Sequence, residues 1–202
     1  MKKLFSYTLS SLLILVSSYV TAQSLSKEDN LINLSFGVGN LVRPQGFTTL
    51  LPPTVFQYER AITEQITIGG YLGYAASTFE DEGFYTVPYS PYNSEYQKYV
   101  WNSKNILFGI KGAYHFGELL NTTKRLDPYS GISLGYNAIT TSLRQKVGSS
   151  DLQPKLSPNP SSRFMFGFFI GARYYVNEKV ALFGELGYST AVLQLGISLK
   201  VK

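Results

Sequence analysis

Long stretches of this chain alternate between two kinds of side chain, and no other feature restricts its fold as strongly. Within residues 163–176, one set of alternate positions is apolar and includes Phe166 and Phe168, whereas the intervening positions include Gly167 and Arg173. Successive side chains of a β-strand point to opposite faces of the sheet. A period of two residues therefore predicts strands with one apolar face and one face rich in small, polar or charged residues.

The same alternation occurs in eight segments of the chain. The predicted strands are 31–39, 54–63, 65–76, 103–116, 128–141, 163–176, 179–189 and 191–201. Long connections follow the first, third and fifth of them, at residues 40–53, 77–102 and 142–162, whereas tight turns follow the second and the sixth. Eight of the nine prolines fall in the long connections, where no strand ladder needs the N–H group that proline lacks. Short turns at one end and long loops at the other are typical of a transmembrane barrel.

The apolar face of the strands predicts the solvent around the barrel. This face carries nearly all the large aliphatic and aromatic side chains and a single charge, Arg60, close to a strand end. A lysine or arginine facing lipid at mid-membrane costs about 2–4 kcal/mol. Because eight closed strands enclose only enough room for side chains, the small and polar face fits the interior. We therefore expect an all-β, eight-stranded antiparallel up-and-down transmembrane β-barrel. A secreted lipocalin-like carrier, with the apolar face turned inward, is the alternative.

Residues 1–22 have the pattern of a cleaved signal peptide. Lys2 and Lys3 precede an apolar stretch, and Val20-Thr21-Ala22 places small side chains where signal peptidases cleave. The apolar stretch is shorter than the roughly 20 residues that cross a bilayer as a helix. We expect cleavage after Ala22, which leaves residues 23–202 as one barrel domain exported across the inner membrane.

Four charged residues fall on the polar face of the predicted strands: Glu59, Lys111, Arg173 and Glu185. Buried charges require partners of opposite sign. We therefore predict that these four side chains form one charge network inside the barrel. The alternative is that they lie near the rims, where trapped water solvates them.

The tripeptide Leu-Gly-Tyr recurs at 72–74, 134–136 and 186–188, late in three strands that run in the same direction. It places three tyrosines on the apolar face near the outer end of the barrel: Tyr74, Tyr136 and Tyr188. A second group is predicted near the inner end: Tyr114, Phe116, Tyr129 and Tyr174. Tyrosine favours membrane boundaries because its ring is apolar and its hydroxyl is polar. The two groups therefore predict two aromatic girdles.

The signal, the alternating strands, the Leu-Gly-Tyr repeats and the terminal strand Val192–Leu199 together resemble the bacterial outer-membrane β-barrel domain family. These are the porin-like, OmpA/OmpX-type small barrels common in Bacteroidota, and the resemblance covers residues 23–202. It implies residence in the bacterial outer membrane, insertion by the barrel-assembly machinery, and contact with outer-membrane lipid and lipopolysaccharide. The chain departs from the pattern at its end, because Val201-Lys202 stands where many such barrels have an aromatic residue.

The residues favour a non-enzymatic protein with a structural or surface-binding role. The predicted loop 77–102 begins with an acidic run and then carries many aromatic side chains, which suit an extracellular binding surface. The candidate binding residues are Tyr85, Tyr89, Tyr92, Tyr96, Tyr99 and Trp101. The alternative is that this loop folds on itself against lipopolysaccharide. The pattern identifies no extracellular ligand.

Other function classes have less support. A pore for small solutes needs an open lumen, but Lys111, Phe169 and Arg173 are expected to fill it. A lipid-modifying barrel enzyme needs a base beside a nucleophile, and the single histidine, His115, is predicted to face inward near the periplasmic end, so we expect no catalytic residue. The chain has no cysteine, and we expect neither a cofactor nor a metal site. Without Lys2 and Lys3 of the signal, the net charge of +5 falls to +3, which is too small to indicate nucleic-acid binding.

Overall fold

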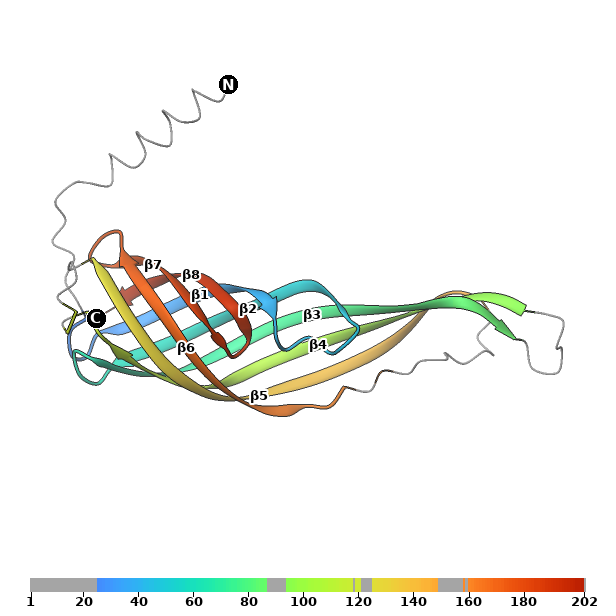
Figure 1. Cartoon of the computed structure of the whole chain (residues 1–202), viewed down its shortest axis with the longest axis horizontal. Coiled ribbons are helices and arrows are strands. Elements are labelled where there is room, and N and C mark those ends of the chain that lie inside the picture. The colour runs from blue at the N-terminus through green and yellow to red at the C-terminus, as the bar shows by residue number, and fades with distance from the viewer. Residues whose placement is uncertain are drawn as a thin grey trace, which may run out of the picture.

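The computed structural model describes residues 25–86, 94–117, 119–120, 125–148, 158 and 160–201. The strands are β1 (Asn30–Asn40), β2 (Thr48–Ala61), β3 (Ile66–Thr86), β4 (Ser94–His115), β5 (Leu126–Val147), β6 (Arg163–Tyr175), β7 (Val180–Tyr188) and β8 (Ala191–Val201). Each pairs antiparallel with its neighbour in sequence, and β1 also pairs with β8, which closes the barrel (Figure 1). The predicted eight-stranded up-and-down barrel is confirmed. The predicted signal peptide, residues 1–22, lies outside the described residues.

The two faces of the barrel wall are the reverse of those of a soluble protein. On the outer face, Ile106, Phe166 and Leu195 are 50, 62 and 51% exposed. On the lumen face, Lys111 and Arg173 are only 6 and 0% exposed. Directly paired residues of neighbouring strands share a face, so the pairing assembles the apolar residues into one outer belt. The alternative of a secreted carrier with an apolar interior is therefore wrong.

Three consecutive strands are much longer than the others. β3, β4 and β5 have 21, 22 and 22 residues, whereas the other strands have 9 to 14. β2 pairs with β3 only as far as Thr78, and β6 pairs with β5 only as far as Asn137. Beyond these points the three long strands continue together past the shorter ones (Figure 1). We call this extension, residues 79–86, 94–102 and 138–147, the projecting sheet.

The projecting sheet corrects two of the predicted loops. Residues 77–102 are predicted as a loop, but β3 continues to Thr86 and β4 begins at Ser94, with regular pairing between them. β5 likewise continues to Val147, inside the predicted loop 142–162. The alternation is lost here because, beyond the barrel, the two faces of the sheet no longer separate an apolar from a polar environment. Aromatic and β-branched residues still favour strands in this region.

The predicted loop 40–53 is also too long, because β2 begins at Thr48 and contains Pro52 and Pro53. The pairing of β2 with β3 shifts register between Thr49 and Leu51 and again before Thr54. Proline cannot donate to a strand ladder, so a strand tolerates it where the pairing is irregular. The irregularity therefore explains how both prolines lie inside a strand.

Tyr129 lies in the lumen and not in the predicted inner girdle, since it is only 1% exposed. The predicted outward tyrosines Tyr74, Tyr174 and Tyr188 are 38, 38 and 61% exposed. Tyr129 is four residues before Ser133, which is buried, and residues at even spacing in one strand share a face. The alternation itself therefore assigns Tyr129 to the interior.

Glycines on the lumen face make room for aromatic rings that cross the interior. A Cβ atom at Gly135 would collide with the hydroxyl of Tyr71, and one at Gly131 would meet the ring of Phe169. Both rings are buried, with exposures of 9 and 6%. Large side chains of one strand thus fill the space that glycines of another leave open, as close packing in a narrow barrel requires.

Candidate functional site

The centre of the lumen brings together charged residues from strands that are far apart in sequence. Glu59 of β2 pairs with Gly69 of β3, and Gly69 pairs in turn with Lys111 of β4. Cross-strand partners share a face, so all three residues point into the lumen at the same level. The glycine between them leaves space for the longer side chains, and Lys111 Nζ lies 3.8 Å from Glu59 Oε1.

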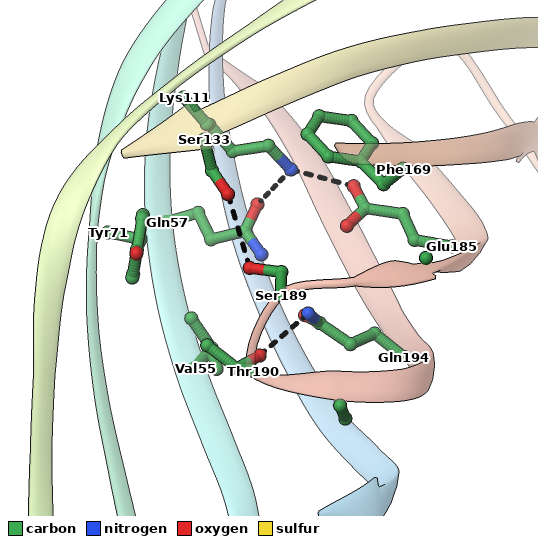
Figure 2. Close-up of a pocket in the computed structure, with 12 residues that line it drawn as sticks. Val55, Gln57, Tyr71, Lys111, Ser133, Phe169, Glu185, Ser189, Thr190 and Gln194 are labelled. Carbon is green, nitrogen blue, oxygen red and sulfur yellow. Dashed lines mark hydrogen bonds and ion pairs between the residues drawn. The ribbon is translucent and has the colours of Figure 1, made fainter. Parts of the chain in front are cut away.

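A second ion pair spans the lumen between opposite walls. Lys111 Nζ of β4 lies 2.7 Å from Glu185 Oε1 of β7, and both side chains are about 5% exposed. Lys111 also donates a 3.0 Å hydrogen bond to Gln57 Oε1, and Tyr129 donates one of 3.0 Å to Glu185. Figure 2 shows Lys111 held between the amide of Gln57 and the carboxylate of Glu185. Its ammonium group also lies 4.3 Å from the centroid of the Phe169 ring.

The fourth predicted charge, Arg173, lies on the other side of Glu59. Arg173 Nη2 is 3.6 Å from Glu59 Oε1, and Nη1 is 3.9 Å from Asp127 Oδ2. Glu59 also accepts hydrogen bonds from Asn33, at 2.6 Å, and from Thr67, at 3.2 Å. The structure thus brings Glu59, Lys111, Arg173 and Glu185 into one buried cluster with Asp127.

Sequence reasoning missed Asp127 because the predicted strand begins one residue later, at 128. Asp127 is paired with Arg173 in the β5–β6 ladder and is 7% exposed. The usable signal was its spacing of two residues from Tyr129, which places both on one face of the strand. Strand ends are the least reliable part of a pattern-based prediction, and this acid lies at such an end.

His115 joins this cluster to Thr67. His115 Nδ1 is 2.8 Å from Asp127 Oδ2, and Nε2 is 3.1 Å from Thr67 Oγ1. A hydroxyl, a histidine and a carboxylate in this order resemble a catalytic triad. However, Thr67 donates its hydrogen to Glu59 Oε2 at 3.2 Å, so the hydroxyl hydrogen is directed at a carboxylate and not at the imidazole. All three residues are buried, so the arrangement links strands and offers no access to a substrate.

A small cavity lies in the lumen beside Lys111. It has a volume of about 20 Å³ and is lined by Gln57, Tyr71, Ser133, Gln194 and others, as Figure 2 shows. A space of this size holds about one water molecule. Ser133 and Ser189 approach to 3.2 Å at its edge, and Gln194 donates a 2.8 Å bond to Thr190. Side chains therefore fill most of the lumen at this level.

The projecting sheet is the second candidate site, and its outer face carries a ladder of charges. Lys98 Nζ of β4 lies 2.6 Å from Glu80 Oε2 and 2.8 Å from Glu82 Oε2, both on β3. Tyr96 donates a 3.1 Å hydrogen bond to Glu82, and its ring packs edge-on against Phe84 at 5.8 Å. Phe84 and Tyr96 are 68 and 43% exposed, so this face presents a pair of aromatic rings beside bound charges.

The six predicted binding residues do not share one surface. Tyr85 and Tyr99 are buried, with exposures of 4 and 2%, and their rings pack together at 5.6 Å on the opposite face from Tyr96. The expectation that both are exposed is wrong, because a paired strand alternates its faces where a loop does not. Trp101 is half-buried. The remaining two, Tyr89 and Tyr92, lie outside the described residues.

The charge ladder changes the acidity of its members. Hydrogen bonds from Lys98 and Tyr96 lower the pKa of Glu82. The hydrogen bond to Glu82 raises the pKa of Tyr96, and hydrogen bonds to Glu80 and Glu82 raise that of Lys98. Each shift favours the charge state that the ladder needs at neutral pH, with Glu82 ionised, Tyr96 neutral and Lys98 protonated.

The part of the chain that the structure describes lacks two further kinds of feature. No three His, Asp or Glu side chains in it gather closely enough to hold a metal ion. None of its residues forms a helix with the length and apolar character that a membrane crossing requires.

The chain matches no family model and no curated protein. Solved structures do resemble it. The N-terminal β-barrel domain of Pseudomonas aeruginosa OprF is 15% identical over 87% of this chain and 98% of its own, with a TM-score of 0.47. The outer membrane protein OprG of the same species is 11% identical over 91 and 99%, with a TM-score of 0.47. Yersinia pestis Ail, the attachment invasion locus protein, in complex with the heparin analogue sucrose octasulfate, is 10% identical over 86 and 96%, with a TM-score of 0.43.

Proposed function

We propose that this protein is an integral β-barrel of the bacterial outer membrane that presents the projecting sheet at the cell surface. The distribution of side chains on the barrel wall supports this most directly. Outward residues such as Ile110, Phe168 and Ile170 are about 60% exposed in a closed ring of strands. A belt of this kind is insoluble unless hydrocarbon covers it, whereas the charges are enclosed.

Membrane residence is tested by fractionation and by gel mobility. The folded protein is expected in the outer-membrane fraction, and it should migrate differently before and after boiling, because a folded barrel keeps its strand pairing in mild detergent. Recovery in the soluble periplasmic fraction, with no effect of boiling on mobility, would refute the proposal.

The projecting sheet is the part that we propose binds an extracellular partner. Its outer face offers Phe84 and Tyr96 as rigid apolar contacts, and Glu80, Glu82 and Lys98 as fixed charges. Rings held by strand pairing lose little conformational entropy when they bind, which is why aromatic residues dominate many interfaces. In this proposal the protein acts by binding and not by catalysis.

Attachment of cells that display the protein to host-cell monolayers and matrix-coated plates tests this role. The double variant Phe84→Ser/Tyr96→Ser removes both exposed rings and is expected to lower attachment. Leu143→Ser is the matched control, because Leu143 is 43% exposed on the opposite face of the same sheet. Equal attachment by the double variant and the wild type, at equal surface display, would exclude this face as the binding surface.

A pore for small solutes remains the alternative function, and the lumen argues against it. The Lys111–Glu185 pair spans the interior, and the adjoining cavity accommodates about one water molecule. We expect no steady conductance when the purified barrel is recorded in planar bilayers. Regular single-channel steps would support the pore instead.

A further inference from the structure

One layer of the lumen contains almost no polar side-chain atoms. Its members come from β2, β3, β4, β6 and the connection between β1 and β2. We call them the apolar layer: Val42, Val55, Tyr71, Ala75 and Leu107, with Met165 packed against them. A Cβ atom at Gly73 would lie 3.2 Å from both Val55 and Leu107, so these two side chains meet over the glycine that pairs with each of them. The hydroxyl of Tyr71 is the one side-chain oxygen that the layer contains.

Polar side chains lie on both sides of the apolar layer. Along β4, the lumen-facing positions run from Ser103 and Asn105 through Leu107 to Lys111, so Leu107 separates two polar regions. Toward the projecting sheet, Ser77, Ser103 and Asn105 are buried. Each of the three has a side-chain polar atom without a hydrogen-bond partner among the described residues. Buried polar atoms of this kind bind ordered water.

The charged side of the layer also has unfilled hydrogen-bonding capacity. Arg173 is fully buried, yet its three guanidinium nitrogens have no hydrogen-bond partner within the described chain. Its contacts with Glu59 and Asp127, at 3.6 and 3.9 Å, are too long for direct hydrogen bonds. The buried hydroxyls of Tyr175 and Ser198 on the same face are likewise unpartnered there. Individual water molecules thus have several binding positions beside the charges, whereas the apolar layer offers them a single hydroxyl.

The connection between β1 and β2 completes the apolar layer from the side of the projecting sheet. Its Val42 is 1% exposed, and the backbone N–H of Val42 donates a 3.1 Å hydrogen bond to Asn40 Oδ1. Leu41 donates its N–H to the carbonyl of Thr190, before β8, and its own carbonyl accepts a 3.1 Å bond from Arg163 of β6. β6 is a neighbour of neither β1 nor β2 in the ring, so the connection reaches across this end of the barrel.

We propose that the apolar layer, completed by Val42, is the permeability seal of the barrel. Water and ions avoid a narrow apolar constriction, because it offers no hydrogen bonds in place of those of bulk water. The buried charges stabilise the wall in this proposal but do not form the seal. If the seal were a matter of filled volume alone, only the size of the lumen side chains would matter, whereas here the polarity of one layer decides. The inference rests on the proposed location in a membrane.

Single-channel recording in planar bilayers tests the inference with variants that alter polarity and hardly alter volume. Val55→Thr/Leu107→Asn replaces two side chains of the apolar layer by polar ones of similar size. It is expected to show steady conductance steps where the wild type shows none, because the layer can then hold water. Lys111→Gln/Glu185→Gln is the matched control, since it removes both charges of the 2.7 Å ion pair and keeps the apolar layer. It should stay silent like the wild type.

Val42→Ser provides a second test that leaves every strand unchanged, in case the double variant of the layer fails to fold. It makes the layer polar from the connection and should also produce steps. Gel mobility before and after boiling establishes that each recorded variant is folded. Folded layer variants that remain silent, or steps in Lys111→Gln/Glu185→Gln or in the wild type, would overturn the inference. Silent but folded and membrane-inserted layer variants defeat only the seal, whereas a wild type without a boiling-dependent shift defeats the proposed location.

Discussion

The lumen and the projecting sheet each contain a lysine held between two glutamates, but in different surroundings. The shortest contact of Lys111 is 2.7 Å, with side-chain exposures of 5 and 4% for the pair, whereas that of Lys98 is 2.6 Å, with exposures of 24 and 42%. Almost equal distances thus occur in a dry and in a wet site. Water and salt screen the outer pair, whereas the inner charges depend on each other and on fixed polar groups such as Gln57 and Tyr129. Burial, and not distance, decides how much each pair matters for stability.

The largest effect is expected from Lys111→Met. It leaves Glu59 and Glu185 buried without their shared cation, and removing one partner of a buried pair lowers the free energy of unfolding by about 3–5 kcal/mol. Urea titration of the barrel in lipid vesicles, followed by gel mobility without boiling, measures the change. Lys98→Met is the matched variant in the projecting sheet. It should leave the urea concentration at the midpoint of unfolding almost unchanged. Equal midpoints for both variants would show that the lumen is as well hydrated as the sheet.

Glu185→Gln should have a smaller effect on the same measurement. The amide oxygen can still accept hydrogen bonds from Lys111 and Tyr129, but the charge is lost, so we expect a decrease of about 1.5–3 kcal/mol. An unchanged urea midpoint would show that the charge of Glu185 does not contribute to the stability of the barrel. Glu82→Gln is the corresponding control on the outer ladder.

The barrel and the projecting sheet also differ in how tightly they pack around a glycine. A Cβ atom at Gly135 in the barrel would collide with Tyr71, whereas one at Gly83 in the projecting sheet would meet nothing within 4 Å. Gly135→Ala is therefore expected to lower the free energy of unfolding by about 1–3 kcal/mol through overpacking. Gly83→Ala should be neutral or slightly stabilising, because it restricts the unfolded chain. A similar loss in both variants would argue against tight packing in the lumen.

The smallest effect concerns the response of the projecting sheet to acid. The pKa of Glu82 is lowered by its hydrogen bonds, so its stabilising contribution is present above the normal carboxyl pKa and is lost as the pH falls through the lowered value. Acidification should therefore increase amide hydrogen exchange in β3 and β4 near Glu82 without unfolding the barrel. Lys98→Met should reduce this pH dependence, and high salt should do the same. A pH response that neither change alters would assign it to other groups.

The sequence by itself determined the number of strands, the face that each strand turns outward and the kinds of residue that fill the lumen. These properties follow from a period of two residues, which is local and needs no knowledge of distant partners. Applied consistently, the same rule would have placed Tyr129 in the interior, but the girdle prediction placed it on the outer face and was wrong.

Tertiary structure decided how the strands are placed against each other. Thr67 and His115 are 48 residues apart, and only the register of β3 against β4 brings them to 3.1 Å. The length of the projecting sheet is likewise set by strand pairing, because both of its faces mix aromatic with polar residues and so give no periodic signal in the sequence. Register depends on many weak contacts summed around a closed ring, and no single stretch of chain contains them.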